Sequence, residues 1–432
     1  MKNFSRLVLF LLIVFDPSAS HATSVSQQSV EGTVTGAIMV ADNRDLGFIE
    51  AVTGARSPAM MPVRRVIVAV TAIPVVTGSG LTYINPTFFA VTDDNGNFTS
   101  PWEDQTRNTV PTRLRVTVLW QSSDEAGGGT TPPATLFRIA RVGVGVDISP
   151  QTVFRANVST TGATDLGVLT APANDETAAY LTTREFFNRV VNNSRILRNR
   201  MPGLVVKTRV PSFDFRFGVT PFPREAYVSE GAPVTSPLTL AHELGHAVTW
   251  AALDLNSAPI NPAIDYSHPL GSPLQWARDS REFSKAAFLE GLADVWALEW
   301  AFGSNVSAVI PRGSLTFRYE AARVIRVNGT VALDCRTIVN AHEFPFCHTT
   351  AVRDLLDNNG TDGVDLTQAD IVNTLNRFRN CLTNGCRDEL GLDALNHHDF
   401  LCNATPASRR TAILGVWSGN GINGGPGSFC GQ

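Results

Sequence analysis

The sequence has few lysines and no long run of basic residues. Of its 35 basic residues only Lys2, Lys207 and Lys285 are lysine, and the arginines are scattered along the chain. With 39 acidic residues the formal net charge is -4, so no basic surface is available for a polyanion. We therefore expect no binding to nucleic acid.

Long apolar segments are also missing. Residues 7–15 form a nine-residue apolar run near the N-terminus, whereas a membrane-spanning helix needs about 20 such residues. Two basic residues precede this run and small residues follow it up to Ala22, as in a secretory signal peptide. We predict that residues 1–22 are a signal peptide, that the protein is secreted, extracellular or periplasmic, and that it has no membrane span.

Cysteine is absent before residue 335, and all six cysteines follow that point. An even number of cysteines in an exported protein predicts up to three disulfides. The absence of a CxxC pair argues against a zinc ion held by cysteine. Other pairings stay open, but the spacing favours Cys335 with Cys347, Cys381 with Cys386, and Cys402 with Cys430.

The region from about residue 30 to 170 shows the alternation of β-strands. Leu114, Val116, Val118 and Trp120 alternate with residues of mostly polar character, which predicts a strand with one buried face. The dipeptide Asn95-Gly96 predicts a tight hairpin turn with two residues of positive φ. Similar strand-like runs cover residues 30–40, 65–73 and 136–148.

The strand-turn-strand pattern of residues 92–98, after a start at Glu31-Gly32-Thr33-Val34, resembles prealbumin-like or carboxypeptidase-regulatory-like modules of secreted bacterial enzymes. The resemblance implies an all-β sandwich for residues 23–174, acting as an accessory domain with a surface or a glycan as its candidate partner. An inhibitory prosegment is the alternative interpretation of this region.

The pattern changes near residue 174. From Thr177 to Arg198 apolar and polar residues mix at helical spacing, and the rest of the chain is mainly helical apart from a strand expected at Leu204–Val210. We therefore predict a multidomain protein, an all-β sandwich followed by an α+β, mainly helical domain over residues 175–432.

The motif His242-Glu243-Leu244-Gly245-His246 is the strongest chemical signal. Ser236-Pro237 is a helix start, and no proline follows before Leu253, so the motif falls on a helix. The two histidines, at i and i+4, share one face and can hold one zinc ion, while Glu243 can reach a water on that metal. The Gly and His of the metzincin pattern do not follow the motif.

A second motif lies 44 residues after His246. Glu290 and Asp294 are again at i and i+4, on a segment that we expect to be helical from Ser280 to Phe302. Such a pair can give one carboxylate to zinc and the other to an N–H of a ligating histidine.

The two motifs together resemble the gluzincin zinc peptidases, and thermolysin-like enzymes in particular. The resemblance implies a zincin-like peptidase fold in which His242, His246 and Glu290 bind Zn2+, Glu243 is the general base and Asp294 orients a histidine. Such enzymes also carry a downstream His or Tyr that donates to the oxyanion. His342, in Asn340-Ala341-His342-Glu343, is our first choice for it, with His348 and Tyr319 as alternatives.

The segment Asp357–Asp365 is rich in acidic residues and glycine, as calcium loops are. Its fifth and sixth positions, Thr361 and Asp362, do not have the EF-hand register. A solvated turn is the simpler interpretation, and Ca2+ is a secondary hypothesis.

Two functional hypotheses follow from these patterns. The first is a secreted zinc metallopeptidase that acts on protein or peptide substrates, in which Glu243 takes a proton from the attacking water and returns it to the leaving amine. A strand before the motif helix would favour endopeptidase action by pairing with an extended substrate, although exopeptidase action stays open. The second is an extracellular binding or adhesion protein with an inactive peptidase-like scaffold.

Overall fold

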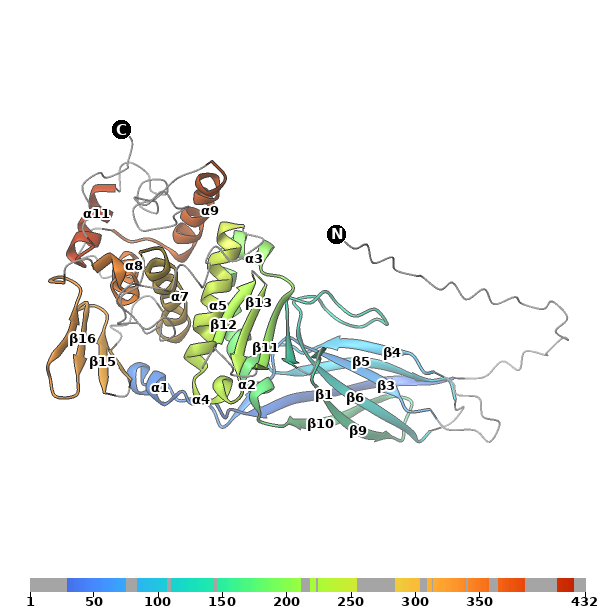
Figure 1. Cartoon of the computed structure of the whole chain (residues 1–432). Coiled ribbons are helices and arrows are strands. Elements are labelled where there is room, and N and C mark those ends of the chain that lie inside the picture. Colours follow the sequence, from blue (N-terminus) through green and yellow to red (C-terminus); the bar gives the residue numbers. More distant parts are fainter. Residues whose placement is uncertain are drawn as a thin grey trace, which may run out of the picture.

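The fold is α+β, with three β-sheets and a set of helices (Figure 1). The computed structural model describes residues 29–74, 84–106, 110–142, 146–210, 218–222, 224–254, 284–303, 309–312, 314–338, 341–356, 364–384 and 410–422. The expected signal peptide, residues 1–22, lies outside these described residues.

A four-stranded sheet and part of a nine-stranded sheet form the strand-rich end of the molecule (Figure 1). The strand expected at residues 30–40 is β1, and it forms the centre of the smaller sheet. That sheet has the order β10-β1-β2, with β5 also pairing with β1. Its strands are β1 (Val30–Ala41), β2 (Met60–Pro62), β5 (Asn97–Asp104) and β10 (Ala163–Ala171).

The nine-stranded sheet has the order β12-β13-β11-β7-β6-β3-β4, with β8 on β7 and β9 on β6. The alternation seen in the sequence is confirmed in β6, where Leu114, Val116, Val118 and Trp120 are all buried. The strands are β3 (Val66–Ala72), β4 (Thr87–Val91), β6 (Thr112–Ser122), β7 (Phe137–Val142), β8 (Asp147–Ile148), β9 (Gln151–Val158), β11 (Leu204–Val210), β12 (Gly218–Phe222) and β13 (Glu225–Ser229).

The hairpin predicted at Asn95-Gly96 is wrong. A turn is present, but it connects β4 to β5, which belong to different sheets. Gly96 has a φ of 79°, whereas Asn95 does not have a positive φ. The Asp93 carboxylate accepts hydrogen bonds from the backbone N–H groups of Asn95 and Asn97, both at 2.8 Å. These bonds hold a turn that carries the chain across to β1 instead of back along β4.

The large sheet continues across the boundary predicted near residue 174. Strand β7 pairs in parallel with β11, and β11 pairs in parallel with β13. One backbone ladder therefore joins the strand-rich end to the helical part. Helix α2 (Asp175–Arg189) begins at a capping box between Asn174 and Thr177, so the change of pattern at residue 174 is the start of a helix. The division into domains stays a prediction.

Helix α2 packs on this sheet through aromatic side chains. The Tyr180 ring lies 5.6 Å from that of Trp120 and 5.3 Å from that of Phe137. Of the helices that follow, α4 (Ala232–Thr235) contacts β13, and α5 (Pro237–Leu253) contacts both β12 and β13. The short helices η1 (Val191–Asn193) and α3 (Arg195–Arg200) pack on α2 and α5 respectively.

The far end of the molecule in Figure 1 holds an antiparallel sheet, α1 and the last helices. Although α1 (Gly47–Thr53) comes from the N-terminal part, its Phe48 ring lies 6.0 Å from that of Phe302. The sheet contains β14 (Val309–Arg312), β15 (Leu315–Arg318), β16 (Arg323–Arg326) and β17 (Val331–Asp334). The helices are α7 (Ser284–Phe302), η2 (Ala341–Glu343), α8 (Pro345–Leu356), α9 (Gln368–Asn384) and α11 (Arg410–Gly419).

A disulfide joins Cys335 to Cys347, which is one of the pairings that the spacing favours. It attaches the antiparallel sheet to α8. The Cys381 side chain and Cys386, Cys402 and Cys430 lie outside the described residues.

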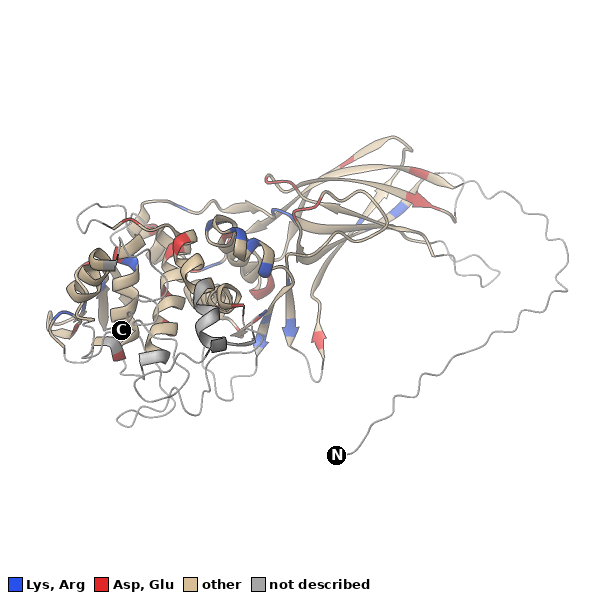
Figure 2. Cartoon of the chain, turned by 90° about the horizontal axis from the view of Figure 1, so that it is seen from above, with Lys and Arg blue, Asp and Glu red and all other residues tan. Residues whose placement is uncertain are grey.

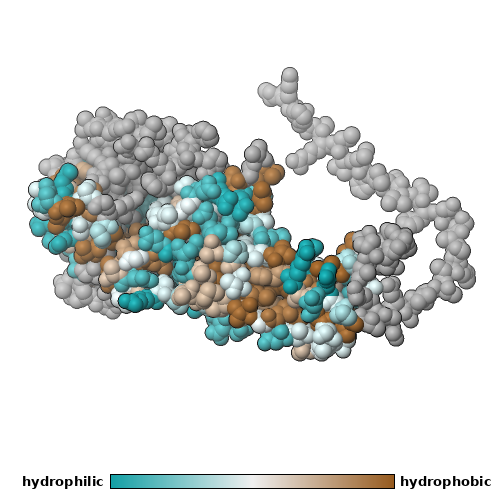
Figure 3. Space-filling model, turned by 90° about the horizontal axis from the view of Figure 1, so that it is seen from below, coloured by the Kyte–Doolittle hydropathy of each residue, from teal (hydrophilic) through white to brown (hydrophobic). Residues whose placement is uncertain are grey.

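The surface of the described residues carries mixed charge and mixed hydropathy. Basic and acidic residues are interspersed (Figure 2), and on the face shown in Figure 3 hydrophobic residues occur in patches separated by hydrophilic ones. Within the part of the chain that the structure describes, no helix has both the length and the apolar character needed to cross a membrane.

Candidate metal centre

Helix α5 runs over Pro237–Leu253, and it begins where the sequence predicts a helix start. Pro237 occupies its first turn, where a missing N–H costs nothing. Asp254 follows the last helical residue and has a left-handed conformation with a φ of 55°. Nearly every residue of the helix is buried, including His242, Glu243 and His246. Burial of three ionisable groups on a single helix calls for partners that satisfy them.

Helix α7 supplies those partners. It covers Ser284–Phe302 and packs along α5. The two helices approach closely where Gly245 faces Ala293, because a Cβ placed on this glycine would lie 2.5 Å from the Ala293 carbonyl oxygen. This close approach brings Glu290 and Asp294 of α7 to the histidines of α5.

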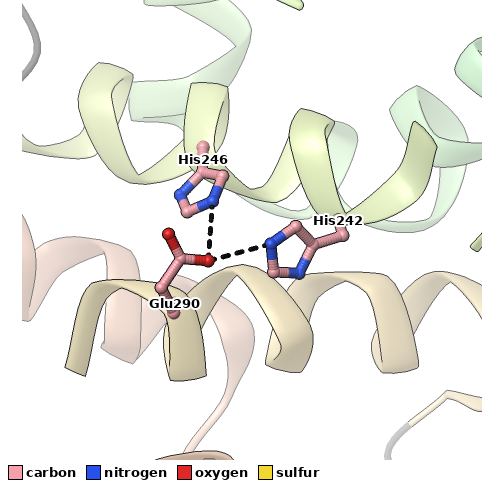
Figure 4. Close-up of side chains that lie close together, drawn as sticks. All are labelled: His242, His246 and Glu290. Atoms are coloured by element: carbon pink, nitrogen blue, oxygen red, sulfur yellow. Dashed lines mark hydrogen bonds and ion pairs between the residues drawn. The ribbon is translucent and has the colours of Figure 1, made fainter. Parts of the chain in front are cut away.

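The two histidines meet at one carboxylate oxygen, as Figure 4 shows. Glu290 Oε2 lies 3.0 Å from His242 Nε2 and 3.2 Å from His246 Nε2. Among the described residues, these three side chains form the cluster that can hold a metal ion. The structure thus brings together the three residues that the sequence nominates as ligands.

This donor set fits zinc. Two imidazole nitrogens and one carboxylate oxygen are typical ligands of a catalytic zinc ion. Metal–ligand bonds of about 2.0 to 2.2 Å in a tetrahedron place neighbouring ligand atoms about 3.3 Å apart, close to the two separations measured between Glu290 and the histidines. All three ligand atoms lie within 4.8 Å of one another, so His242, His246 and Glu290 are close enough to hold the ion once they shift around it.

Asp294 completes the surroundings of His242. Its Oδ1 lies 2.8 Å from His242 Nδ1, and the Asp294 side chain is fully buried. A carboxylate at Nδ1 holds the proton there and leaves Nε2 as the nitrogen that faces Glu290 and a metal.

In the metal-free protein the site stabilises a charged His242. Burial alone would lower its pKa, but the hydrogen bonds and charges of Asp294 and Glu290 raise the pKa of His242 to about 10. Burial alone would raise the pKa of Glu290, but the charges and hydrogen bonds of His246 and His242 hold it well below its ordinary value. An ionised carboxylate only accepts hydrogen bonds. Because each nitrogen of His242 faces a carboxylate, both nitrogens carry protons.

Zinc binding should therefore be coupled to proton release. The ordinary histidine pKa is 6.5, so the stability that His242 adds to the metal-free fold is complete below about pH 6.5 and is lost as the pH rises toward 10. Zinc requires neutral imidazole, so the apparent zinc affinity should rise by about tenfold per pH unit between pH 6.5 and 8.5. Calorimetric zinc titrations in two buffers of different ionisation enthalpy measure the proton released, and release of none would contradict a charged His242.

The substitution Asp294→Asn tests the orienting carboxylate. It keeps the shape of the side chain but removes its charge, and we expect the zinc affinity to fall by about 10- to 100-fold. Zinc competition with a chromophoric chelator measures this change. Asp165→Asn, at an exposed position of β10, is the matched control and should keep the wild-type affinity. An unchanged affinity in Asp294→Asn would show that Asp294 does not position His242.

No family model matches the chain, and no curated protein matches it. Among solved structures, a candidate carbohydrate-binding protein from Pseudomonas aeruginosa is 15% identical to this chain. It covers 36% of this chain and 99% of its own, with a TM-score of 0.16. A likeness of this size carries no argument about fold or function.

Trp250 is a feature of the site that the sequence did not single out. Its ring stacks on that of His246, with centroids 5.6 Å apart and planes at 23°. Among the described residues, His246 Nδ1 has no hydrogen-bond partner, so the Trp250 ring adds to the contacts that orient this histidine, namely those with Glu290 and with the His242 ring. The sequence could have indicated this contact, because Trp250 follows His246 by four residues, about one helical turn.

Glu243 lies on α5 between the two histidines and is 6% exposed. It is three residues before His246 and therefore on the same side of the helix. It does not belong to the group of ligand atoms formed by His242, His246 and Glu290. Glu243 is therefore a candidate for proton transfer and not for metal ligation.

Two of the candidates for the oxyanion donor, His348 and Tyr319, are buried. His348 on α8 packs against Phe288 and Trp417, and its Cβ faces Gly291 of α7. His348 thus lies where α8 packs on α7, and its role as the oxyanion donor stays a prediction.

Tyr319 is also buried, and its ring packs against Phe346 at 5.1 Å. The backbone of His342 lies in η2, which packs against α7, but its side chain is outside the described residues. Its role stays a prediction. Most of the acidic segment Asp357–Asp365, namely residues 357–363, is outside them as well.

Proposed function

We propose that the protein is a secreted, zinc-dependent peptidase of the gluzincin, thermolysin-like type. The observation that carries this proposal is the convergence of His242, His246 and Glu290 on one point, with Glu290 Oε2 3.0 and 3.2 Å from the two Nε2 atoms. Asp294 behind His242 adds the orienting carboxylate that catalytic zinc sites use. Export is supported by the disulfide between Cys335 and Cys347, a bond typical of oxidising compartments.

His242, His246 and Glu290 would hold the zinc ion. A bound zinc ion supplies Lewis-acid chemistry, lowering the pKa of water toward neutrality and polarising a carbonyl. Glu243 accepts the proton of the attacking water and returns it to the leaving amine. The low exposure of Glu243 and of the three ligands, between 4% and 6%, limits competition from bulk water and strengthens their electrostatic interactions.

Strand β12 is the candidate binding edge for an extended substrate. It ends the order of the nine-stranded sheet, pairs antiparallel with β13 and packs against α5. An edge strand can add one more strand through backbone hydrogen bonds, which bind a peptide with little dependence on its sequence. This arrangement favours endopeptidase action on unfolded protein.

Removal of zinc tests the proposal directly. The purified protein should contain one zinc ion per chain and cleave an unstructured protein such as reduced, alkylated casein. A chelator should abolish cleavage and zinc should restore it, because no described group other than the metal site supplies the chemistry. Mass spectrometry of the metal content and of the products measures both. A folded protein that binds no zinc, or a zinc-loaded one that cleaves no peptide bond, would instead support the inactive scaffold.

A further inference from the structure

A polar pocket that shares no residue with the metal site lies where α2 meets the turn before β3. Its volume is about 410 Å³, and we call it the arginine pocket. The size is at the lower end of the range for small-molecule sites. It is lined by Arg64, Arg65, Asp94, Asp124, Arg184, Asn188 and Asn192.

The backbone of the turn that carries Arg64 and Arg65 is held in place from three sides. The Arg65 N–H donates to the Thr92 carbonyl at 3.1 Å, and the Arg65 carbonyl accepts from the Ser123 N–H at 3.0 Å. The Arg64 carbonyl accepts from the Tyr180 hydroxyl at 2.8 Å. Arg65 has a φ of 57°, which is costly for a residue with a side chain and persists where its surroundings enforce it.

Helix α2 forms the opposite wall. Tyr180, Arg184 and Asn188 of α2 follow one another at intervals of four residues, so they lie on one side of the helix. Asn192 follows in η1. The hydrogen bond from Tyr180 to the Arg64 carbonyl joins the two walls, and a site whose walls are joined in advance binds at a lower entropic cost.

The charges of the pocket are not balanced by its own residues. Three guanidinium groups face two carboxylates, and among the described residues no partner is seen for the Arg64 side chain. The carboxylates of Asp94 and Asp124 are 67% and 52% exposed, so their ion pairs with Arg65 and Arg184 contribute little. Arg184 itself is only 9% exposed, and its Nε has no acceptor among the described residues.

We propose that the arginine pocket binds a small ligand through an oxyanion, a carboxylate or a phosphate group. Guanidinium groups recognise these planar or tetrahedral oxygens through paired, charge-assisted hydrogen bonds. Arg64 is the first contact, because it is exposed at the pocket. Asn188 and Asn192 add amide groups that can bind hydroxyl groups of the same ligand. This site is separate from the metal site and does not depend on peptidase activity.

Calorimetric titration of the full protein with inorganic phosphate and with glucuronate, at constant ionic strength, tests the proposal. At least one of them should bind saturably; phosphate alone would identify a phosphoryl ligand, glucuronate alone a carboxylate. Arg64→Gln should weaken binding by about tenfold or more, since a charge-assisted hydrogen bond is lost. The affinity of Arg64→Lys should lie between those of the wild type and Arg64→Gln, because lysine keeps the charge but lacks the paired donors.

Arg155→Gln, at an exposed arginine of β9, is the matched control and should bind as the wild type does. Circular dichroism should show that every variant is folded, as expected for exposed positions. Absence of saturable binding by both anions would overturn the proposal. So would equal binding by wild type and Arg64→Gln, or an equal loss in Arg155→Gln, which would indicate a general effect of charge.

Discussion

The substitution Glu243→Gln should lower the rate of peptide cleavage by about 1000-fold while the protein keeps its zinc. A positioned general acid–base group contributes about 100- to 10,000-fold to a rate, and glutamine has the shape of glutamate but cannot accept the proton. Glu243 is not among the clustered ligand atoms, so one zinc ion per chain should remain. The substitution removes proton transfer but keeps the contacts that bind the substrate, so kcat should fall with little change in KM.

The measurement is kcat and KM on an internally quenched peptide, with the metal content determined on the same preparation. Glu31→Gln, at an exposed position of β1, removes one glutamate charge elsewhere and should keep full activity. If Glu243→Gln retained more than about a tenth of the wild-type kcat, Glu243 would not be the general base. Loss of zinc together with activity would instead make Glu243 part of the metal site.

The site residues were accessible from the sequence because they depend on local geometry. Two pairs at i and i+4, His242 with His246 and Glu290 with Asp294, each place their side chains on one face of a helix. The prediction that the first pair lies on a helix starting at Ser236-Pro237 is confirmed by α5. That these two faces meet was expected only from the resemblance to the gluzincins, because no local pattern in the sequence specifies the packing of Gly245 on Ala293.

Longer-range features were less accessible. The turn at Gly96 has the composition of a hairpin, yet β4 and β5 join different sheets because β5 pairs with β1 over its whole length. The parallel pairing of β7 with β11 joins residues that are 67 apart in the sequence, a contact that no local pattern specifies. The helical spacing predicted from Thr177 corresponds to α2, but the large sheet continues beyond the domain boundary predicted near residue 174.

Gly245→Ala should destabilise the fold and weaken zinc binding, although alanine favours helices more than glycine does. Its Cβ would lie 2.5 Å from the Ala293 carbonyl oxygen and 2.9 Å from the Ala293 Cα, distances that force α5 and α7 apart. Overpacking of this kind costs about 1 to 3 kcal/mol, and we expect the free energy of unfolding to fall by about 2 kcal/mol. The separation also moves Glu290 from the two histidines, so zinc affinity should fall at least about tenfold.

Gly415→Ala provides the matched control for this effect. Gly415 lies within α11, and a Cβ placed on it meets no atom within 4 Å. There the change should be neutral or should stabilise the protein by up to about 1 kcal/mol, since glycine is the poorer helix former. Denaturant unfolding and zinc competition on both variants separate helix propensity from helix packing. Equal stability and equal zinc affinity in the two variants would mean that the close contact of α5 with α7 does not hold the metal ligands together.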